Sequence, residues 1–201
     1  MQLETERFSI RPLTALDAAP HLCAWTLDPL GAEMLNQSQH VWAIEDQRRL
    51  FAAQANNPSQ LRLGIWVREI NKLIGFFVID LHPKNQAYTL TTLIGELSWR
   101  GQHVTAETSD LLHGHFFGKL GFLKAKANVR PQNKSMLWMM ANGGWRKEAH
   151  LIKHIRDNVN QTRVDILAMG LLPKDWEESV ARRKRFALER QARQRDIDHA
   201  K

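Results

Sequence analysis

The sequence predicts a mixed α/β fold, in which hairpins and crossover helices are built around one central sheet. Short segments that alternate apolar and polar residues, or are wholly apolar, recur between polar turns and indicate strands. Segments with apolar residues at helical spacing lie between several of these strands. Hydrophobic residues make up 43% of the 201 residues, which is enough for a sizeable core. We expect one domain over residues 1–172 and a basic helical extension over residues 173–201.

The first half of the chain is expected to begin with a strand over residues 3–11, where apolar and polar side chains alternate. Thr14 and Asp17 can cap a helix through residues 21–26, and Asp28-Pro29 ends it, because a residue before proline disfavours helical angles. The elements that follow are a helix over residues 41–55 and strands over residues 61–69, 72–81 and 88–94.

The second half is expected to begin with a helix over residues 105–120, whose apolar residues recur at helical spacing and which Gly121 ends. The later elements are a strand over residues 123–129, a helix over 133–142, paired strands over 146–155 and 163–172, and a last helix from Pro173 to about residue 200.

The turn after the strand at residues 88–94 has the composition of an anion site. It carries Gly95, Arg100 and Gly101, and the helix at residues 105–120 follows it. Backbone N–H groups of such a turn and of the first helical turn point at one spot, and the helix dipole favours negative charge there. Arg100 adds a fixed charge that suits a phosphate. We therefore expect a phosphate-bearing ligand at this turn.

Four segments, in chain order, resemble the GNAT N-acetyltransferases. Arg100-Gly101-Gln102-His103-Val104-Thr105 is similar to the start of the family's pyrophosphate loop, Arg/Gln-x-x-Gly-x-Gly/Ala. Residues 129–136, followed by Gly143-Gly144-Trp145, resemble the segment V-x-P-x-N-x-x-S/A … L-G-F. Residues 3–13 and 163–172 resemble the first and last strands of the RimJ/RimL-like branch.

The resemblance implies a central mixed, mostly antiparallel sheet with helices on both sides and a C-terminal helix. Two parallel strands, Tyr88–Ile94 and Leu123–Val129, would splay apart and admit the pantetheine of acetyl-CoA. It implies acetyl transfer from acetyl-CoA to a primary amine (a protein N-terminus, an amino sugar or a small metabolite) by direct attack in a ternary complex. The cofactor-binding residues would be Leu93, Ile94, Arg100, Gly101, Gln102, His103, Val104, Thr105 and Asn133.

Candidates for catalysis and acceptor binding are fewer. Glu96 is the nearest carboxylate to the expected thioester and could deprotonate an ammonium through water; the alternative is a solvated turn residue. The family's tyrosine and serine acids are replaced by Met140 and Met136, and Ser135 is expected to face elsewhere. The resemblance implies that Trp25 and Trp42 shape the acceptor pocket, with core packing as the alternative.

Two positions leave a second hypothesis open. His103 and Thr105 stand where the family has small residues, which suggests a non-catalytic binding module with a degraded pyrophosphate loop. Thr105 could also cap the helix that follows, and Asn133 could be a helix cap as well as a cofactor contact.

The charge is concentrated in the tail. Residues 182–195 contain seven cationic residues and one anionic residue, so they hold +6 of the net charge of +7. RNA or ribosome association through this tail is a third hypothesis, although the rest of the chain is close to neutral.

The remaining features narrow the class of protein. Cys23 alone excludes an intrachain disulfide framework, no apolar run is long enough to span a bilayer, and no signal peptide is visible. No histidine or cysteine cluster has the spacing of a metal site, and His113 and His115 would face apart on a helix. We expect a cytoplasmic protein without a metal, whose oligomeric state, including a homodimer, is open.

Overall fold

The computed structural model describes residues 1–25, 27–35, 43–54, 56–158 and 160–199. Within them, eight strands form one sheet in the order β1-β2-β3-β4-β5-β6-β8-β7. The β5–β6 pair is parallel and the other pairs of described strands are antiparallel. The bounds are β1 (Leu3–Glu4), β2 (Phe8–Pro12), β3 (Gln60–Val67), β4 (Lys72–His82), β5 (Ala87–Ile94), β6 (Lys124–Val129), β7 (Arg146–Arg156) and β8 (Arg163–Leu171). The predicted fold class, a mostly antiparallel mixed sheet with one parallel pair, is confirmed.

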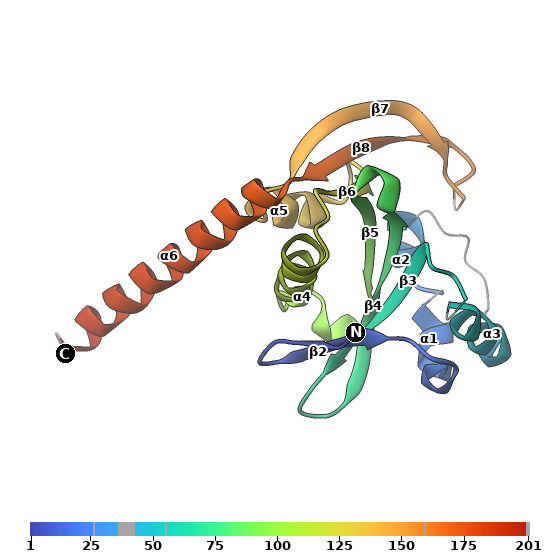
Figure 1. Ribbon diagram of the computed structural model, residues 1–201, viewed down its shortest axis with the longest axis horizontal. Coiled ribbons are helices and arrows are strands. Elements are labelled where there is room, and N and C mark those ends of the chain that lie inside the picture. Colours follow the sequence, from blue (N-terminus) through green and yellow to red (C-terminus); the bar gives the residue numbers. More distant parts are fainter. Residues whose placement is uncertain (26, 36–42, 55, 159, 200–201) are drawn as a thin grey trace.

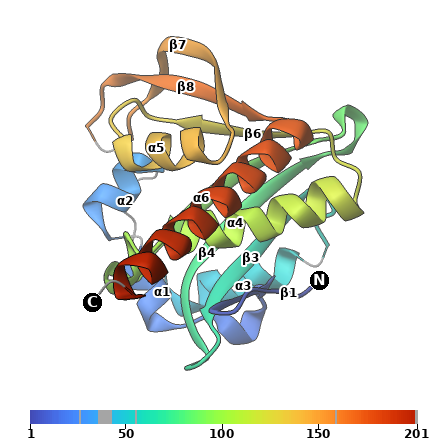
Figure 2. The same ribbon diagram turned by 90° about the vertical axis from the view of Figure 1, so that its left-hand side faces the viewer.

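Helices cover both faces of this sheet. Figure 1 shows α4 and α6 on one side and α1 and α3 on the other, and Figure 2 shows α6 lying across α4. The helices are α1 (Pro20–Trp25), α2 (Pro29–Met34), α3 (Ile44–Gln54), α4 (Val104–His113), α5 (Lys134–Asn142) and α6 (Pro173–His199), with a 3₁₀ turn η3 (Leu97–Trp99). None of the helices in the described part of the chain is both long enough and apolar enough to cross a membrane.

The parallel strands β5 and β6 separate along their length. Their register joins Ala87 to Lys124, Tyr88 to Ala125 and Thr89 to Lys126, and no described pair continues beyond Thr89. Strand β5 stays paired with β4 as far as Ile94, whereas β6 pairs with β8 as far as Val129. The sheet therefore opens between β5 and β6 beyond Thr89, as the resemblance implied.

Two apolar clusters hold the layers together. The larger lies between the sheet and α4 and includes the fully buried Phe8, Phe77, Tyr88 and Phe116. The smaller packs α1 and α3 on the opposite face of β3 and β4 and consists of Leu13, Leu22, Trp25, Phe51, Trp66 and Leu73. Burial of apolar surface at roughly 25 cal/mol per Å² makes these clusters the main source of stability.

The strand expected over residues 3–11 is instead a hairpin. Strand β1 turns back onto β2, so that Leu3 pairs with Ile10. The Thr5 hydroxyl accepts a hydrogen bond from the Phe8 backbone N–H at 2.9 Å, and the Thr5 N–H donates to the Phe8 carbonyl at 2.8 Å. These local bonds close a turn that the alternating pattern alone did not reveal.

Two helix predictions also need correction. Asp28-Pro29 was expected to end a helix, but it also starts α2, because the Asp28 carboxylate accepts a hydrogen bond from the Gly31 N–H at 3.1 Å and caps the new helix. The helix expected over residues 105–120 consists of α4 followed by a π-helical segment, Gly114–Lys119. Gly121, with a φ of +70°, follows it as expected.

The end of β5 depends on Gly95. A β-carbon at this position would lie 1.9 Å from Cδ2 of Trp25, which packs directly over the backbone. We expect Gly95→Ala to lower the free energy of unfolding by about 1–3 kcal/mol, because the indole must move out of its packed position. Urea denaturation measures this change.

The matched control is Gly118→Ala, where a β-carbon meets nothing within 4 Å. That variant should keep the native stability or gain up to about 1 kcal/mol from the lower entropy of the unfolded chain. Equal stabilities for the two variants would show that Trp25 does not require a glycine at position 95.

Candidate functional site

Two overlapping cavities lie beside the separated strands. The first, which we call the α4–α5 cavity, has a volume of about 470 Å³ and lies between these helices, the turn after β5 and Arg183 of α6. The second, the strand cavity, has a volume of about 300 Å³ and is lined by residues 90–94 of β5, residues 127–129 of β6 and α2. Side chains that line both cavities come from α4 (Thr105, Ser109 and His113) and from α5 (Ser135, Met136 and Met139).

The turn after β5 opens its backbone to these cavities. Gly101, with a φ of +76°, lines both of them, and a β-carbon there would meet nothing within 4 Å. His103 precedes the first residue of α4 and has a φ of +61°, the left-handed conformation. The first N–H groups of α4 therefore follow a turn with exposed backbone, which is the arrangement that binds phosphate groups.

Arg100 lies beside the strand cavity, but its guanidinium is engaged by the protein. Its Nε donates to the Ile94 carbonyl at 2.8 Å, and its Nη2 donates to Oδ2 of Asp28 at 2.6 Å. Arg100 thus closes the end of β5 and ties the turn to the cap of α2. The sequence predicted a positive charge for phosphate at this place; the structure pairs that charge with Asp28.

The turn is also fixed by Arg7, which precedes β2, and by Phe8, the first residue of β2. The Arg7 Nη2 donates to the Gln102 carbonyl at 3.1 Å and to the Glu107 carboxylate at 2.7 Å. Trp99 packs edge-on against Phe8, with ring centroids 5.7 Å apart. The sequence comparison had used Arg7 only as part of a strand pattern, and this anchoring of the turn by a residue far away in the chain was missed.

His103 and Thr105 line the α4–α5 cavity and do not fill it. The prediction that Thr105 caps the helix is wrong, because Thr105 is the second residue of α4; the N-cap position is His103, whose side chain makes no capping hydrogen bond. Val104 is buried and lines the α4–α5 cavity, whereas Gln102 is exposed and lines neither cavity.

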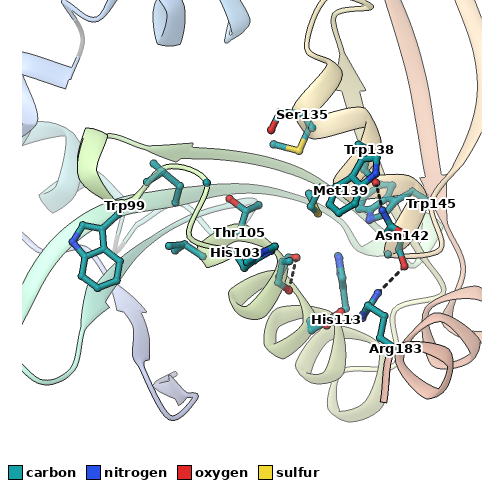
Figure 3. Close-up of a pocket in the computed structure, with 18 residues that line it drawn as sticks. Trp99, His103, Thr105, His113, Ser135, Trp138, Met139, Asn142, Trp145 and Arg183 are labelled. Atoms are coloured by element: carbon teal, nitrogen blue, oxygen red, sulfur yellow. Dashed lines mark hydrogen bonds and ion pairs between the residues drawn. The ribbon is translucent and has the colours of Figure 1, made fainter. Parts of the chain in front are cut away.

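Helix α5 forms the opposite wall. Asn133 caps it, since its Oδ1 accepts a hydrogen bond from the Met136 N–H at 3.1 Å, and the same residue lines the strand cavity. The cap is therefore confirmed, and its position leaves the cofactor role available. Ser135 was expected to face elsewhere, but in the first turn of α5 both Ser135 and Met136 line the cavities (Figure 3).

The predicted catalytic residue Glu96 lies outside the lining of both cavities. Its Oε2 accepts a hydrogen bond from Lys72 Nζ at 2.6 Å, and hydrogen bonding from Lys72 lowers the pKa of the Glu96 carboxyl despite partial burial. A carboxylate that is paired with an ammonium ion and has a lowered pKa is a weak base. Proton abstraction by Glu96 finds no support in this arrangement.

Trp25, one of the two tryptophans predicted for the acceptor pocket, lines neither cavity. Trp25 is 7% exposed, belongs to the smaller apolar cluster and stacks on Phe76 with ring centroids 6.3 Å apart. Trp42 lies outside the described residues. The strand cavity is instead lined by α2 residues, among them Leu30 and Met34, which the sequence analysis did not include because α2 was not predicted.

A buried pair of polar residues lies at the junction of the cavities. The Tyr88 hydroxyl and Nδ1 of His113 are 2.6 Å apart, and the two side chains are 0% and 2% exposed. Burial lowers the pKa of His113 to about 3, helped by the charge of Arg183, and burial raises the pKa of Tyr88. Both side chains are therefore neutral at pH 7, and among the described residues Nε2 of His113 has no hydrogen-bond partner.

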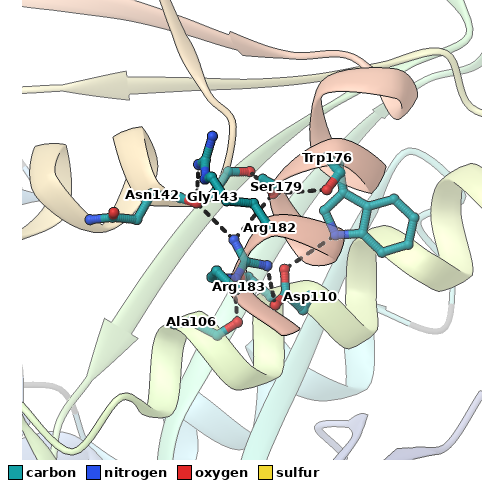
Figure 4. Close-up of polar contacts among 9 residues, drawn as sticks. Ala106, Asp110, Asn142, Gly143, Trp176, Ser179, Arg182 and Arg183 are labelled. Atoms are coloured by element: carbon teal, nitrogen blue, oxygen red, sulfur yellow. Dashed lines mark hydrogen bonds and ion pairs between the residues drawn. The ribbon is translucent and has the colours of Figure 1, made fainter. Parts of the chain in front are cut away.

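Helix α6 closes the far end of the α4–α5 cavity. Arg183 donates to Asp110 at 2.6 Å and to the Asn142 carbonyl at 2.9 Å, and Trp176 Nε1 donates to Asp110 at 3.2 Å (Figure 4). Ser179 Oγ donates to the Gly143 carbonyl at 3.0 Å. The basic extension is thus joined to the domain by its first turns, and Arg183 is engaged within the fold.

The residues present fit a phosphate-bearing acyl-CoA. The turn exposes its backbone at Gly101, α4 begins beside it, and His113 brings to the cavity a buried nitrogen that has no hydrogen-bond partner in the described part of the chain. Within the described residues no group of three or more histidine, cysteine, aspartate or glutamate side chains could hold a metal ion.

His103 offers a test of the turn. Its left-handed conformation strains a side chain but not glycine, so we expect His103→Gly to raise the free energy of unfolding by about 0.5–1 kcal/mol. Gln102→Gly, at the neighbouring position where φ is not positive, should lower it by about 0.5–1 kcal/mol. Effects of the same sign in urea denaturation would contradict the conformation of the turn.

The lowered pKa of His113 predicts that the folded protein becomes less stable as the pH falls. The pKa of His113 falls from 6.5 in the unfolded chain to about 3 in the fold, so the folded state binds fewer protons between these values. The contribution is fully present above pH 6.5 and is lost by about 1.4 kcal/mol per pH unit as the pH falls below it. Urea denaturation between pH 7 and pH 5 should show this slope, and His113→Gln should flatten it. An equal slope in the native protein and in His113→Gln would show that a group other than His113 causes the pH dependence.

Comparison with known proteins identifies the family and supports the fold. Residues 7–146, more than half of the chain, match the family model described as Acetyltransferase (GNAT) domain. A search of curated proteins finds no match.

Solved structures share the fold at low identity. A spermidine N-acetyltransferase from Vibrio cholerae, in complex with CoA and spermine, is 13% identical with a TM-score of 0.75, and the match covers 86% of this chain and 99% of that chain. A GNAT-family acetyltransferase from Bacillus anthracis is 18% identical with a TM-score of 0.72, covering 87% and 99%. A ribosomal-protein-S5-alanine acetyltransferase from Vibrio fischeri is 14% identical with a TM-score of 0.74, covering 88% and 98%. The separated parallel strands, the phosphate-binding turn and the family match together lead to one conclusion: this chain belongs to the GNAT acetyltransferase family.

Proposed function

We propose that the protein transfers an acetyl group from acetyl-CoA to a primary amine, by direct attack in a ternary complex. The observation that carries the proposal is the strand cavity, which is lined by β5, β6, the turn at residues 100–101 and α2 at once. One continuous space therefore connects a phosphate-binding turn with the opposite face of the sheet, where an acceptor can enter.

The turn and the first turn of α4 would hold the pyrophosphate. Arg7 and Arg100 fix the backbone of this turn before any ligand arrives, which reduces the entropy lost on binding. Leu93, Ile94, Gly101, Thr105 and Asn133 line the strand cavity and are the proposed contacts.

Strand β5 would position the reacting group. Beyond Thr89 its edge has no described partner on the β6 side, so backbone N–H groups of residues 90–94 that face this edge can donate hydrogen bonds. N–H donors held by a sheet polarise a carbonyl without reorganisation, which is the largest contribution available to this site. Acetyl-CoA would supply an activated thioester, whose C–S bond breaks as the amine nitrogen bonds to the carbonyl carbon.

None of the described residues that line the strand cavity has a carboxylate that could accept the proton of the amine. We propose that the acceptor amine loses its proton to water that enters from the α2 side and that the leaving thiolate is protonated by water. This account explains why neither a tyrosine nor a serine is needed at the positions of Met140 and Met136, since a thiolate leaves readily. It predicts a rate that rises with pH as the acceptor amine becomes uncharged.

The acceptor is proposed at the level of a class. Two of the structural relatives are a spermidine N-acetyltransferase and a ribosomal-protein-S5-alanine acetyltransferase. The apolar α2 side chains Leu30 and Met34 border the strand cavity, which suits an amine carried on an aliphatic chain or a peptide N-terminus. An amino sugar is tested beside these two kinds of acceptor for comparison. A cytoplasmic location and a homodimer are part of the same proposal.

The non-catalytic alternative has less support. His103 and Thr105 were its basis, and both border an open cavity. RNA association through residues 182–195 is also less favoured, because Arg182 and Arg183 donate to the Asn142 carbonyl.

Thr105→Trp tests the cofactor site. Thr105 lines both cavities from a regular helical position, so an indole there should fill the space without backbone strain. We expect acetyl-CoA affinity in calorimetric titration to fall at least about 100-fold, which corresponds to roughly 2.7 kcal/mol. Amine acetylation by the variant should fall in parallel.

Lys134→Trp is the matched control, because Lys134 begins α5, is exposed and lines neither cavity. It should bind acetyl-CoA as the native protein does. Acetyl-CoA binding that Thr105→Trp leaves unchanged would remove the proposed site, and binding without acetylation of spermidine, an alanine-terminated peptide or glucosamine would favour the binding module.

A further inference from the structure

The buried histidine at the junction of the two cavities has a fixed orientation. The His113 ring stacks on Phe117 with centroids 5.6 Å apart and an interplanar angle of 16°, and it meets Trp145 edge-on at 5.6 Å. Nδ1 is held by the Tyr88 hydroxyl at 2.6 Å. Since three groups restrain the ring, the direction in which Nε2 points is set before any ligand binds.

The hydrogen bond with Tyr88 also selects the tautomer. If the Tyr88 hydroxyl donates to Nδ1, the proton of the neutral imidazole is on Nε2, and this N–H is the one donor left over. In the reverse arrangement Nδ1–H donates to the phenol oxygen, and both the phenol proton and Nε2 are left without partners in the core. Because each unsatisfied buried group costs free energy, the first arrangement is favoured.

His113 lines both cavities, and none of the described residues accepts a hydrogen bond from its Nε2. Figure 3 shows it on the α4 side of the cavity, with Trp145 and Arg183 beside it and Asn142 at the end of α5. Arg183 is paired with Asp110, yet its charge still acts on the imidazole. This corner of the cavity therefore offers one donor that no described residue pairs, the Nε2–H of His113, beside the positive charge of Arg183, and it favours an oxygen atom of a ligand.

We propose that His113 is a binding residue for acyl-CoA, whose Nε2–H donates to a carbonyl or phosphate oxygen of the ligand, with Tyr88 as the residue that positions it. The proposal rests on the proposed function of the cavities. His113 follows Val104 by nine residues, which places it about 14 Å along α4 from the phosphate-binding turn. A ligand that is anchored at the turn and extends between α4 and α5 passes this position.

The experiment follows the imidazole directly. NMR of protein with ¹⁵N-labelled histidine reports the tautomer and the Nε2 proton of His113. We expect the neutral Nε2–H form between pH 6 and pH 8 in the free protein and a downfield shift of this proton when acetyl-CoA is added. Titration with pantetheine and with adenosine 3′,5′-bisphosphate separates the two sources of the oxygen, since the fragment that carries it should reproduce the shift.

The acetyl-CoA affinities of variants at His113 and Tyr88 provide a second test. His113→Phe keeps an aromatic ring between Phe117 and Trp145 and removes the donor, so acetyl-CoA should bind about five- to tenfold more weakly. His113→Gln, which retains an N–H donor, should recover part of the loss. Tyr88→Phe should weaken binding less and should release the tautomer preference in the NMR spectrum, which a purely structural role for Tyr88 would not do.

The outcomes are distinct. Native protein that binds acetyl-CoA with no change at His113, together with equal affinity for His113→Phe, overturns this inference and leaves the proposed function intact. Native protein that does not bind acetyl-CoA overturns the proposed function first. Because the NMR titration uses the native protein, a variant that fails to fold does not prevent the test.

Discussion

The divergence of β5 and β6 is the constraint on which the rest of the molecule depends. Strand β5 remains paired with β4 and β6 remains paired with β8, but the two strands pair with each other only over Ala87–Thr89 and Lys124–Lys126. A closed sheet would pair these edges and leave no backbone donors for a ligand. Beside the separated strands lies a cavity lined by α2, β5, β6 and α5, which extends to the turn at residues 100–101, the proposed phosphate site. The two helices that border it, α4 and α5, are held apart by apolar packing on the sheet and are bridged by α6.

Local patterns predicted much of this arrangement. The apolar segment 88–94, the glycines of the turn and the helical spacing that follows are features of neighbouring residues, and the strand, turn and helix were found where they were expected. The Asn133 cap was likewise visible, because a cap depends on its own helix. The short helix α2 was missed, because Asp28-Pro29 ends one helix and starts another, and the sequence pattern does not distinguish these roles. Because α2 was not predicted, the residues that form one wall of the strand cavity were not identified from the sequence.

The remaining features depend on contacts between distant residues. Arg100 was predicted to face a phosphate, yet its guanidinium forms an ion pair with Asp28, 72 positions earlier in the chain. Glu96 has the residue type of a base, but Lys72 determines its pKa. His113 attracted attention only as half of a His-x-His pair, whereas its partner is Tyr88, 25 positions away on β5. A side chain's chemistry follows from its neighbours in space, and a single sequence does not contain those neighbours for long-range pairs.

The central claim is that the separated strands and the turn bind one acyl-CoA molecule together. Backbone amide NMR of the ¹⁵N-labelled protein during titration with acetyl-CoA tests it most directly, because it reports every region at once. The account predicts shifts with one common saturation curve at residues 90–94 of β5 and at residues 101–105 of the turn and α4. Shifts confined to the basic residues of α6, or shifts at the turn without any at β5, would contradict it.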